Sequence, residues 1–291
     1  MPILLALLSA AAYGVADFLG GTASRRLHVV VVTLISMTTG AAFILVVCLM
    51  QGGVVDRADV VWSLGAGVVG SLGIATFYSA LAIGPMGVVA PVSAVTSALV
   101  PVVSGLALGE RPGPLVMLGI GLAFPAIAMV ARERRLPDEP RQVATGTLLR
   151  ALAAGLGFGG YLVLISRTSE GSNLWPVLIG RGASVGVMVT LAAGLGVLRW
   201  PRAASKRGAR EDGTDRSVTL SLAGGVFDAG GNAFYLLAVR SDLLALVAAV
   251  QSLYPAATVG LAGALHGERP QRIQGAGMAV GLVAVVFVAV G

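Results

Sequence analysis

Three ionisable side chains lie inside long apolar segments of this sequence, and their chemistry raises the first question. Asp17 occurs in "YGVADFLGG", Asp228 in "SLAGGVFDAGGNAFYLLAV" and Arg181 in a third apolar segment. In the middle of a bilayer such charges cost at least about 2.5–3.5 kcal/mol on insertion scales, so they normally face a cavity or one another. We expect the carboxylates to bind a proton or a cationic solute group, and the guanidinium to bind a carboxylate or pair with the acids.

A structural interpretation of the same residues stays open. An Asp–Arg pair can simply hold helices together. Asp17 lies four residues before Gly21, which at a rise of about 1.5 Å per residue is about 6 Å from the end of its segment. At that depth Asp17 can also lie near the membrane interface, close to Arg25 and Arg26.

Uncharged polar residues extend the candidate site. Asn232 lies one helical turn beyond Asp228, and Tyr13 one turn before Asp17, each on the same face as its acid. Packing is the alternative role for any one of the further polar residues, which each need a hydrogen-bond partner or water in a bilayer. Together they predict a wet, aromatic-lined cavity for a small organic solute. These further candidates are Tyr78, Tyr161, Tyr235, Gln251 and Tyr254.

Apolar helices are the elements that must position these residues. Of the 291 residues 56% are hydrophobic and 12% are charged, with a mean hydropathy of +0.88, whereas soluble domains carry about 25% charged residues. The sequence predicts an all-α membrane protein with ten helices, each long enough to cross about 30 Å of hydrocarbon. The predicted helices run over residues 3–20, 29–50, 61–83, 86–108, 114–131, 147–166, 174–198, 218–239, 242–265 and 272–290.

An internal repeat organises these helices. "GERP" occurs at 109–112 and again at 267–270, an offset of 158, and each copy ends one apolar segment before another. Earlier in the chain an offset of 145 aligns Tyr13-Gly14 with Phe158-Gly159. The two offsets differ because the loops differ in length.

The repeat predicts two halves of five helices, over residues 1–131 and 147–291, joined by a polar loop at 132–146. A second polar stretch, 199–217, is also expected to be a loop. An odd number of spans per half inserts the second half upside down relative to the first. Such inverted repeats are typical of transporters, whose solute site lies near the midplane between the halves.

The chain resembles the drug/metabolite transporter superfamily, in its EamA-type branch. The resemblance rests on the duplicated aromatic-Gly pair, on Gly-Glu-Arg closing the fourth helix of each half, and on a proline, Pro255, thirteen residues before Glu268. It implies a ten-helix inverted-repeat exporter or exchanger of small organic solutes. The first half departs from the pattern, because Ser97 replaces the proline and Ser36 stands opposite Arg181.

Two further local features carry expectations. Prolines inside the fourth, fifth and ninth predicted helices predict kinks, and the fourth and ninth helices are candidates to bend during gating. Glu110 and Glu268 are expected to be structural, either pairing with Arg111 and Arg269 or capping the helix that follows.

The basic residues set an orientation. Fifteen Lys and Arg residues fall in loops on one side of the predicted helices and four on the other. The positive-inside rule then places both termini outside, whereas the family resemblance implies both inside.

Several function classes are excluded by composition. The net charge of +6 comes from short loops, so nucleic acid is not expected as a partner. Cys48 is the only cysteine, and His28 and His266 form no ligand pair, so neither a metal nor a cofactor is expected. A Walker A motif is absent from the sequence, and "GLGFGG" at 155–160 follows no strand. The spans contain no Ser–Lys or paired His, so we do not expect an enzyme.

The leading hypothesis is a secondary active transporter of the bacterial inner membrane that moves a small metabolite or drug-like solute by alternating access. Proton antiport through Asp228, helped by Asp17, is the favoured coupling, although an exchanger or facilitator has the same sequence pattern. The protein is expected to act as a monomer or homodimer in the lipid bilayer. A lipid-carrier flippase or a non-transporting membrane partner is the alternative, and the sequence does not identify the solute.

Overall fold

The computed structural model describes residues 1–24, 27, 29–83, 86–130, 145–194, 211–266 and 271–290, and the elements within these ranges are all helices. They are α1 (Pro2–Ser24), α2 (Val29–Gln51), α3 (Arg57–Ile83), α4 (Met86–Ala107), α5 (Pro114–Val130), α6 (Thr145–Ser166), the 3₁₀ turn η1 (Glu170–Ser172), α7 (Trp175–Gly194), α8 (Glu211–Val239), α9 (Leu244–Gln251), α10 (Tyr254–His266) and α11 (Arg272–Val290).

Nine of the ten predicted helices each correspond to one helix of the structure, and the ninth, 242–265, is broken into α9 and α10. Pro255 lies at the start of α10 and has no N–H to donate to the carbonyl of Gln251, so the first helix ends there. The predicted kink is thus a complete break at this proline. In contrast, α5 continues through Pro125 as one helix.

One of the two predicted loops is partly helical in the structure. The helix α8 begins at Glu211, inside the stretch 199–217 that was expected to be a loop. Most of the other predicted loop, 132–146, lies outside the described residues, and α6 already begins at Thr145.

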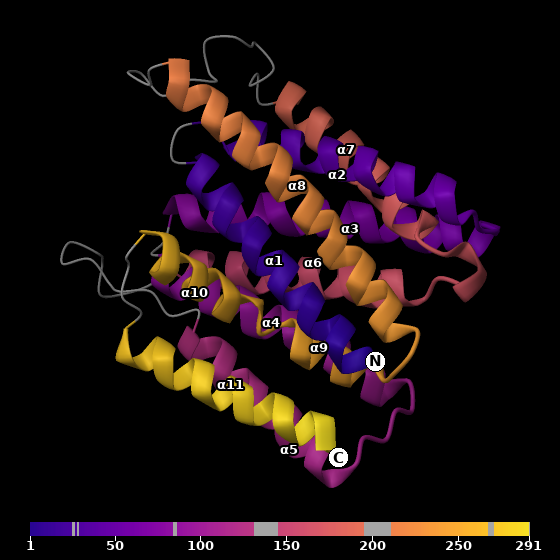
Figure 1. Ribbon diagram of the computed structural model, residues 1–291, viewed down its shortest axis with the longest axis vertical. Helices are drawn as coiled ribbons and strands as arrows, with labels where there is room; N and C mark the ends of the chain where they lie inside the picture. The colour runs from indigo at the N-terminus through magenta and orange to yellow at the C-terminus, as the bar shows by residue number, and fades with distance from the viewer. Residues whose placement is uncertain are drawn as a thin grey trace.

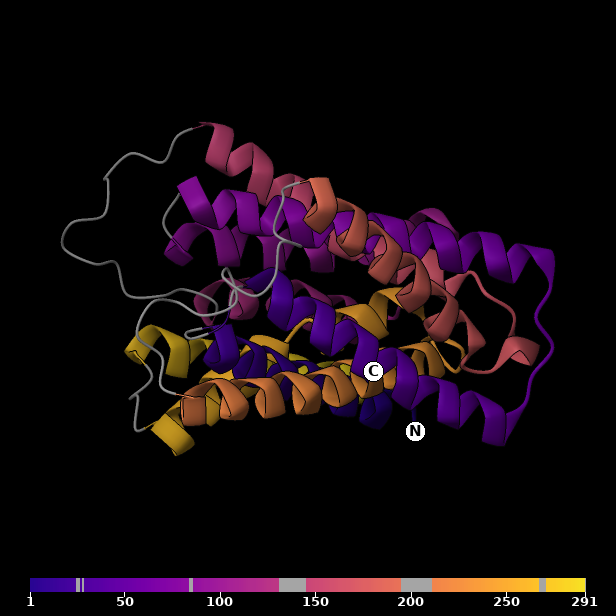
Figure 2. The same ribbon diagram turned by 90° about the horizontal axis from the view of Figure 1, so that it is seen from above.

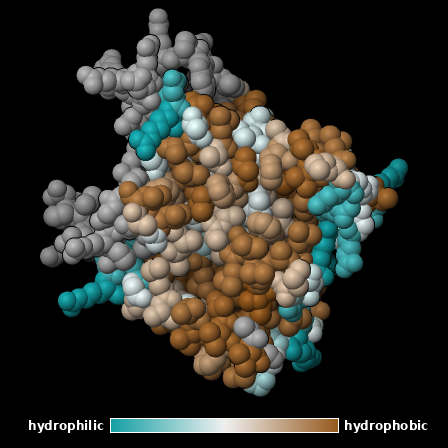
Figure 3. Space-filling view, in the orientation of Figure 1, coloured by the Kyte–Doolittle hydropathy of each residue, from teal (hydrophilic) through white to brown (hydrophobic). Residues whose placement is uncertain are grey.

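The surface of the molecule is suited to lipid. Five helices are long and apolar enough to cross a membrane, namely Pro2–Ser24, Val30–Gln51, Arg57–Phe77, Thr145–Ser166 and Asp215–Val239, and shorter apolar helices accompany them. Apolar side chains cover the middle of the visible face, and hydrophilic ones gather toward two opposite ends (Figure 3). Exposed leucine, valine and phenylalanine side chains on this scale are expected only where hydrocarbon surrounds them. The protein is therefore a multi-pass membrane protein.

The helices form two layers. In one layer α1 packs on α8 and α10, and in the other α6 packs on α3 and α4. Figures 1 and 2 show α1 and α8 on one side and α3 and α6 on the other, with α5 lying beside α11 at one edge and α2 beside α7 toward the opposite edge. Both termini lie at the same end of the bundle (Figure 1).

Glycines permit the closest helix contacts. A Cβ atom on Gly225 of α8 would collide with the backbone of Ser36 in α2, and one on Gly67 of α3 would collide with the backbone of Gly180 in α7. Ser36 Oγ donates to the carbonyl of Ser221 across the first contact at 2.9 Å. Small residues at these crossings let membrane helices approach closely, as expected where lipid supplies no hydrophobic driving force between them.

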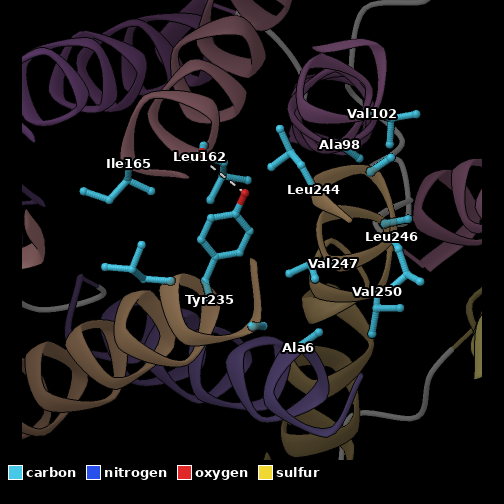
Figure 4. Packing of buried hydrophobic residues seen from close by; sticks show 14 of the residues in the cluster. Ala6, Ala98, Val102, Leu162, Ile165, Tyr235, Leu244, Leu246, Val247 and Val250 are labelled. Atoms are coloured by element: carbon cyan, nitrogen blue, oxygen red, sulfur yellow. Dashed lines mark hydrogen bonds between the residues drawn. The ribbon is translucent and has the colours of Figure 1, made fainter. Parts of the chain in front are cut away.

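The apolar core lies between α6, α8, α9 and α4. Figure 4 shows the ring of Tyr235 extending from α8 into this core, between Leu162 on α6 and Val247 on α9. Its hydroxyl donates to the carbonyl of Leu162 at 3.3 Å, and the side chain has no exposed surface. A buried tyrosine needs such an acceptor, so Tyr235 joins the two layers.

The motif after α4 has a structural function. Gly109 has a φ of 96°, in the left-handed region that favours glycine, and turns the chain out of the helix. The carboxylate of Glu110 then accepts hydrogen bonds from the N–H groups of Leu244 at 2.6 Å and Ala245 at 2.9 Å. Glu110 therefore caps α9 rather than the helix that follows it in sequence, which corrects the expectation. Glu268 lies outside the described residues.

A second polar cluster ties segments together at the same end of the molecule. The Arg240 guanidinium donates to the carbonyls of Ser169 at 2.6 Å and Asn173 at 2.8 Å, while Asp59 accepts from the N–H and hydroxyl of Ser169 at 2.6 and 2.8 Å. Burial lowers the pKa of Arg240 from its usual value, and the nearby carboxylates of Asp59 and Glu170 oppose that shift. These bonds join the starts or ends of α3, α7 and α8.

Candidate functional site

An ion pair between α7 and α8 forms the centre of the candidate site. Nη2 of Arg181 lies 2.5 Å from Oδ2 of Asp228. The Arg181 side chain is 6% exposed, whereas that of Asp228 is 39% exposed. The pair predicted from the sequence therefore forms, with the cation enclosed by protein and the anion accessible.

Arg181 reaches Asp228 because of a glycine that the sequence reasoning missed. A Cβ atom on Gly40 of α2 would lie 2.5 Å from Nη1 of Arg181 and 2.6 Å from the carbonyl oxygen of Gly225. Any larger residue at this position would occupy the space that the guanidinium uses between α2 and α8. A glycine in mid-helix costs about 1 kcal/mol of stability relative to alanine. A glycine in the middle of a predicted helix therefore indicates a close contact, and Gly40 could have been selected on that basis.

Asp17 faces the interior and is nevertheless accessible. It is an exposed residue of α1, and it lies nine residues, or two and a half helical turns, beyond Leu8, which is 40% exposed. Residues at that spacing point in opposite directions, so Leu8 faces lipid and Asp17 faces inward. Asp17 has accessible surface within the bundle rather than on its outer wall.

The same spacing places Asp228 on the interior. Leu237 is 38% exposed on the outer face of α8, and Asp228 lies nine residues before it, on the opposite face. Asp17 and Asp228 are also close enough for their charges to interact. Accessible acids on inward faces of two packed helices indicate a polar hollow between them.

Three tyrosines lie close to these charged side chains. The rings of Tyr13 on α1 and Tyr254 on α10 lie 6.3 Å apart at an angle of 59°. Tyr254 lies within range of the charge of Asp17, and Tyr161 on α6 within range of the charges of Arg181 and Asp228. All three tyrosines are only partly buried. Tyr13, Tyr161 and Tyr254 thus come together from three different helices.

Other predicted site residues lie elsewhere or are enclosed. Tyr235 has no exposed surface and lies in the apolar core, so it does not line an accessible cavity. Asn232 is 7% exposed and its side-chain amide donates to the backbone carbonyl of Asp228 at 2.7 Å. Gln251 is 4% exposed. The side chain of Tyr78, on α3, lies outside the described residues.

Two of the predicted site residues each have a buried polar atom that lacks a hydrogen-bond partner among the described residues. These atoms are Nε of Arg181 and Oε1 of Gln251. A buried group of this kind usually has a partner, either protein, water or ligand. The Nε of Arg181 is therefore a donor that a solute acceptor or a water molecule can satisfy.

The described site holds more acids than bases. Two carboxyl groups, those of Asp17 and Asp228, share the single guanidinium of Arg181, and Asp17 has no ion pair or hydrogen bond from any described side chain. Arg25 and Arg26 lie outside the described residues. In the part of the chain that the structure describes, no group of three or more His, Cys, Asp or Glu side chains is arranged to hold a metal ion.

An apolar pocket of about 320 Å³ lies on the outer side of α1, α2 and α8. Its lining includes Val15, Phe43, Phe227 and Gly230. Val15 lies two residues from Asp17 and Gly230 two residues from Asp228, spacings that point to opposite faces of a helix. The pocket is therefore separate from the polar hollow and belongs to the lipid-facing surface.

Comparison with known families agrees with the predicted resemblance. Residues 1–132 match the model of the EamA-like transporter family, which is part of the drug/metabolite transporter superfamily. The matched region ends just after α5. The resemblance predicted from the duplicated aromatic-Gly and Gly-Glu-Arg motifs is confirmed.

Comparison with solved structures supports the fold over the whole chain. One similar structure, described only as "Crystal structure of protein", has a TM-score of 0.72 and 16% sequence identity, and the alignment covers 99% of this chain and 96% of the other. At that identity the likeness concerns the fold alone. No curated protein matches the chain in sequence.

Proposed function

We propose that this chain, whose residues 1–132 belong to the EamA-like transporter family, is a secondary active transporter of a small organic metabolite or drug-like solute in the bacterial inner membrane. One observation carries the proposal, namely the accessible acids on inward faces of α1 and α8. Neither lipid solvation nor helix packing requires an accessible, unpaired carboxyl group within a bundle, whereas a solute path can use one.

The pairing of helices supports an inverted repeat of five helices. If α1 to α5 correspond to α6, α7, α8, α9 with α10, and α11, then the contact of α1 with α8 corresponds to that of α6 with α3. The contacts of α1 with α10 and of α2 with α8 likewise correspond to those of α6 with α4 and of α7 with α3. The glycine crossings follow the same rule, because Gly67 and Gly225 are separated by the repeat offset of 158.

In alternating access the solute path is closed at one end of the bundle at a time, and part of the protein must move to open it. The contacts of Glu110 with α9 and of Arg240 with the segment before α7 join several helices at the end that holds both termini. We infer that this end is closed in the present conformation. The break between α9 and α10 lies beside the site, at Tyr254, and is the element best placed to change its geometry.

Proton antiport is the coupling that the site favours. A proton that binds Asp228 removes one partner of its ion pair, which frees the Arg181 guanidinium for a solute acceptor. A proton that binds Asp17 removes the remaining unbalanced charge. Exchange of protons for solute at these two acids would link the two fluxes.

The test is solute flux in proteoliposomes with an imposed pH gradient, using Asp228→Asn and, as a matched control, Asp242→Asn, which changes an exposed acid between α8 and α9. We expect Asp228→Asn to abolish pH-driven flux and Asp242→Asn to retain it. If Asp228→Asn folds and leaves pH-driven flux intact, the proton role of this residue is wrong.

A lipid-carrier flippase is a weaker candidate on the described geometry. It would need a lateral path from the lipid to the charged residues. The apolar pocket between α1, α2 and α8 faces lipid, but it lies on the opposite faces of α1 and α8 from Asp17 and Asp228. The pocket therefore offers no support for such a path.

A further inference from the structure

The Asp17 side of the site differs from the Arg181 side in what it can bind. Arg181 already neutralises Asp228 through the ion pair. Asp17 receives neither an ion pair nor a hydrogen bond from any described side chain, and the charged groups within range of it include a second carboxylate, Asp228. A carboxylate in this position is neutralised by a cation or a proton rather than by packing.

Aromatic rings flank the same carboxylate. Tyr13 precedes Asp17 by one helical turn on the same face of α1, and Tyr254 approaches from the start of α10, with ring centroids 6.3 Å apart and planes inclined at 59°. Both rings have accessible surface. Rings at this distance pack against each other, and a tyrosine pair beside an acid attracts ammonium groups through the negative face of an accessible ring.

The Nε–H group of Arg181 has no hydrogen-bond partner among the described residues. This observation is independent of Asp17 and the tyrosines, and it also indicates that a ligand binds here. The Arg181 side chain is 6% exposed. A buried guanidinium nitrogen requires an acceptor. A solute with an ammonium group at Asp17 and an acceptor atom further along its length would satisfy both groups.

From these contacts we propose that the solute of this transporter is an organic cation, whose ammonium group binds the Asp17 carboxylate beside the packed rings of Tyr13 and Tyr254. This inference rests on the proposed transport function, because it specifies the chemistry of the solute at the same site. It assigns Asp17 a direct contact with the solute and leaves Asp228 to the ion pair with Arg181.

Three probes of similar size test the charge requirement on the unmodified protein. They are phenethylammonium, 2-phenylethanol and 3-phenylpropionate, added to the protein in phosphatidylcholine nanodiscs, with heats of binding measured by calorimetry and empty nanodiscs subtracted. We expect phenethylammonium to bind at least about tenfold more tightly than the neutral and anionic probes. Equal responses to all three, or a preference for the anion, would overturn the proposal.

Variants then locate the contact. Asp17→Asn should weaken phenethylammonium binding about tenfold, whereas the loop variant Asp242→Asn should leave it unchanged. Tyr254→Leu should weaken it several-fold and Tyr254→Phe should retain it, because the ring rather than the hydroxyl makes the contact. Unchanged binding by folded Asp17→Asn would overturn the assignment. If Asp17→Asn does not fold, the tyrosine pair decides, and equal affinities of Tyr254→Leu and Tyr254→Phe would overturn it.

Flux separates this proposal from the transport function. Proteoliposomes that bind phenethylammonium in an Asp17-dependent manner but do not move it would support the cation site and contradict transport. Proteoliposomes that move 3-phenylpropionate without binding phenethylammonium would support transport and overturn the cation site.

Discussion

The two layers of the bundle share a framework but differ in polarity. Where α1, α8 and α10 meet, the interior holds Tyr13, Asp17, Asp228 and Tyr254. At the positions related to these by the repeat offsets, where α6, α3 and α4 meet, the sequence has Phe158, Leu162, Gly70 and Thr96. The corresponding site in the second layer is thus apolar, and Phe158 there packs edge-on against Phe77 at 5.8 Å.

This difference separates the residues at helix crossings from the residues of the proposed site. The features common to both layers are glycines at helix crossings, such as Gly14 against Tyr254 and Ala257, and Gly159 against Ser97 and Val100. The two acids, Asp17 and Asp228, occur in the layer of α1 and α8 only, while Arg181 reaches Asp228 from α7, which packs on α3. The proposed inverted repeat would need equivalent packing at equivalent crossings, whereas the proposed solute would need only one set of polar groups.

Breaking the ion pair should have the largest effect on the polar layer. Asp228→Leu leaves the 6% exposed Arg181 without its partner, and we expect a loss of about 3 kcal/mol of unfolding free energy, the lower end for buried pairs because Asp228 is partly exposed. Arg181→Met should cost less, since the remaining acid is the accessible partner. The measurement is unfolding by SDS titration in mixed micelles.

The double variant Arg181→Met with Asp228→Leu sharpens this test. Removing both charges leaves neither partner unpaired, so we expect it to be more stable than Asp228→Leu alone while losing flux. A double variant no more stable than the single one would show that the two residues do not act as a pair.

The glycine crossings should respond alike in both layers. Gly225→Ala and Gly67→Ala each place a methyl group against backbone of a neighbouring helix, and overpacking of this kind costs about 1–3 kcal/mol. Gly230→Ala and Gly182→Ala serve as controls, because nothing lies within 4 Å of a Cβ at either position. Melting temperatures of the four variants would compare them. A large loss at one crossing only would contradict the shared framework.

The cap on α9 should have a moderate effect. Glu110→Gln keeps one acceptor oxygen but loses the charge that binds the N–H groups of Leu244 and Ala245. We expect a loss of about 1 kcal/mol. Glu170→Gln, an exposed acid in η1, is the control. Hydrogen exchange at the first amides of α9 would show the loss directly, and unchanged exchange would contradict the cap.

The smallest effect is expected from a substitution that gives one layer the residue found at the corresponding position of the other. Tyr235→Phe reproduces the residue at the corresponding position, Phe77, and removes only the 3.3 Å hydrogen bond to Leu162. The apolar packing remains, so the loss should stay below about 1 kcal/mol. Flux should be retained, since Tyr235 is not accessible. If the Tyr235→Phe protein is stable but loses flux, Tyr235 belongs to the transport site after all.

Much of the fold was predictable because the information is local. Runs of apolar residues long enough to span a bilayer predict the helices, and Pro255 marks the point where one of them breaks. The position of this break could be predicted from Pro255, but the fact that the helix ends there could not, since α5 continues through Pro125. A proline leaves the carbonyl four residues earlier without its usual hydrogen bond. Whether the helix kinks or ends there depends on which other groups can bond to that carbonyl.

The candidate site was predictable in its residues but not in its contacts. Asp17, Arg181 and Asp228 stand out as charges in apolar segments, and the structure brings them together. The same reasoning selected Tyr235 and Gln251, which are enclosed in the structure. Hydropathy marks a polar side chain within a span, but it does not distinguish an accessible hollow from a hydrogen-bonded position in the core.

The sequence by itself determined where most of the apolar helices lie and which few charged residues fall inside them, because both depend on neighbours along the chain. The tertiary structure decided which of those residues meet. Arg181 reaches Asp228 only through the space at Gly40, and Glu110 caps a helix that begins 134 residues later. Such contacts depend on how distant helices pack against one another.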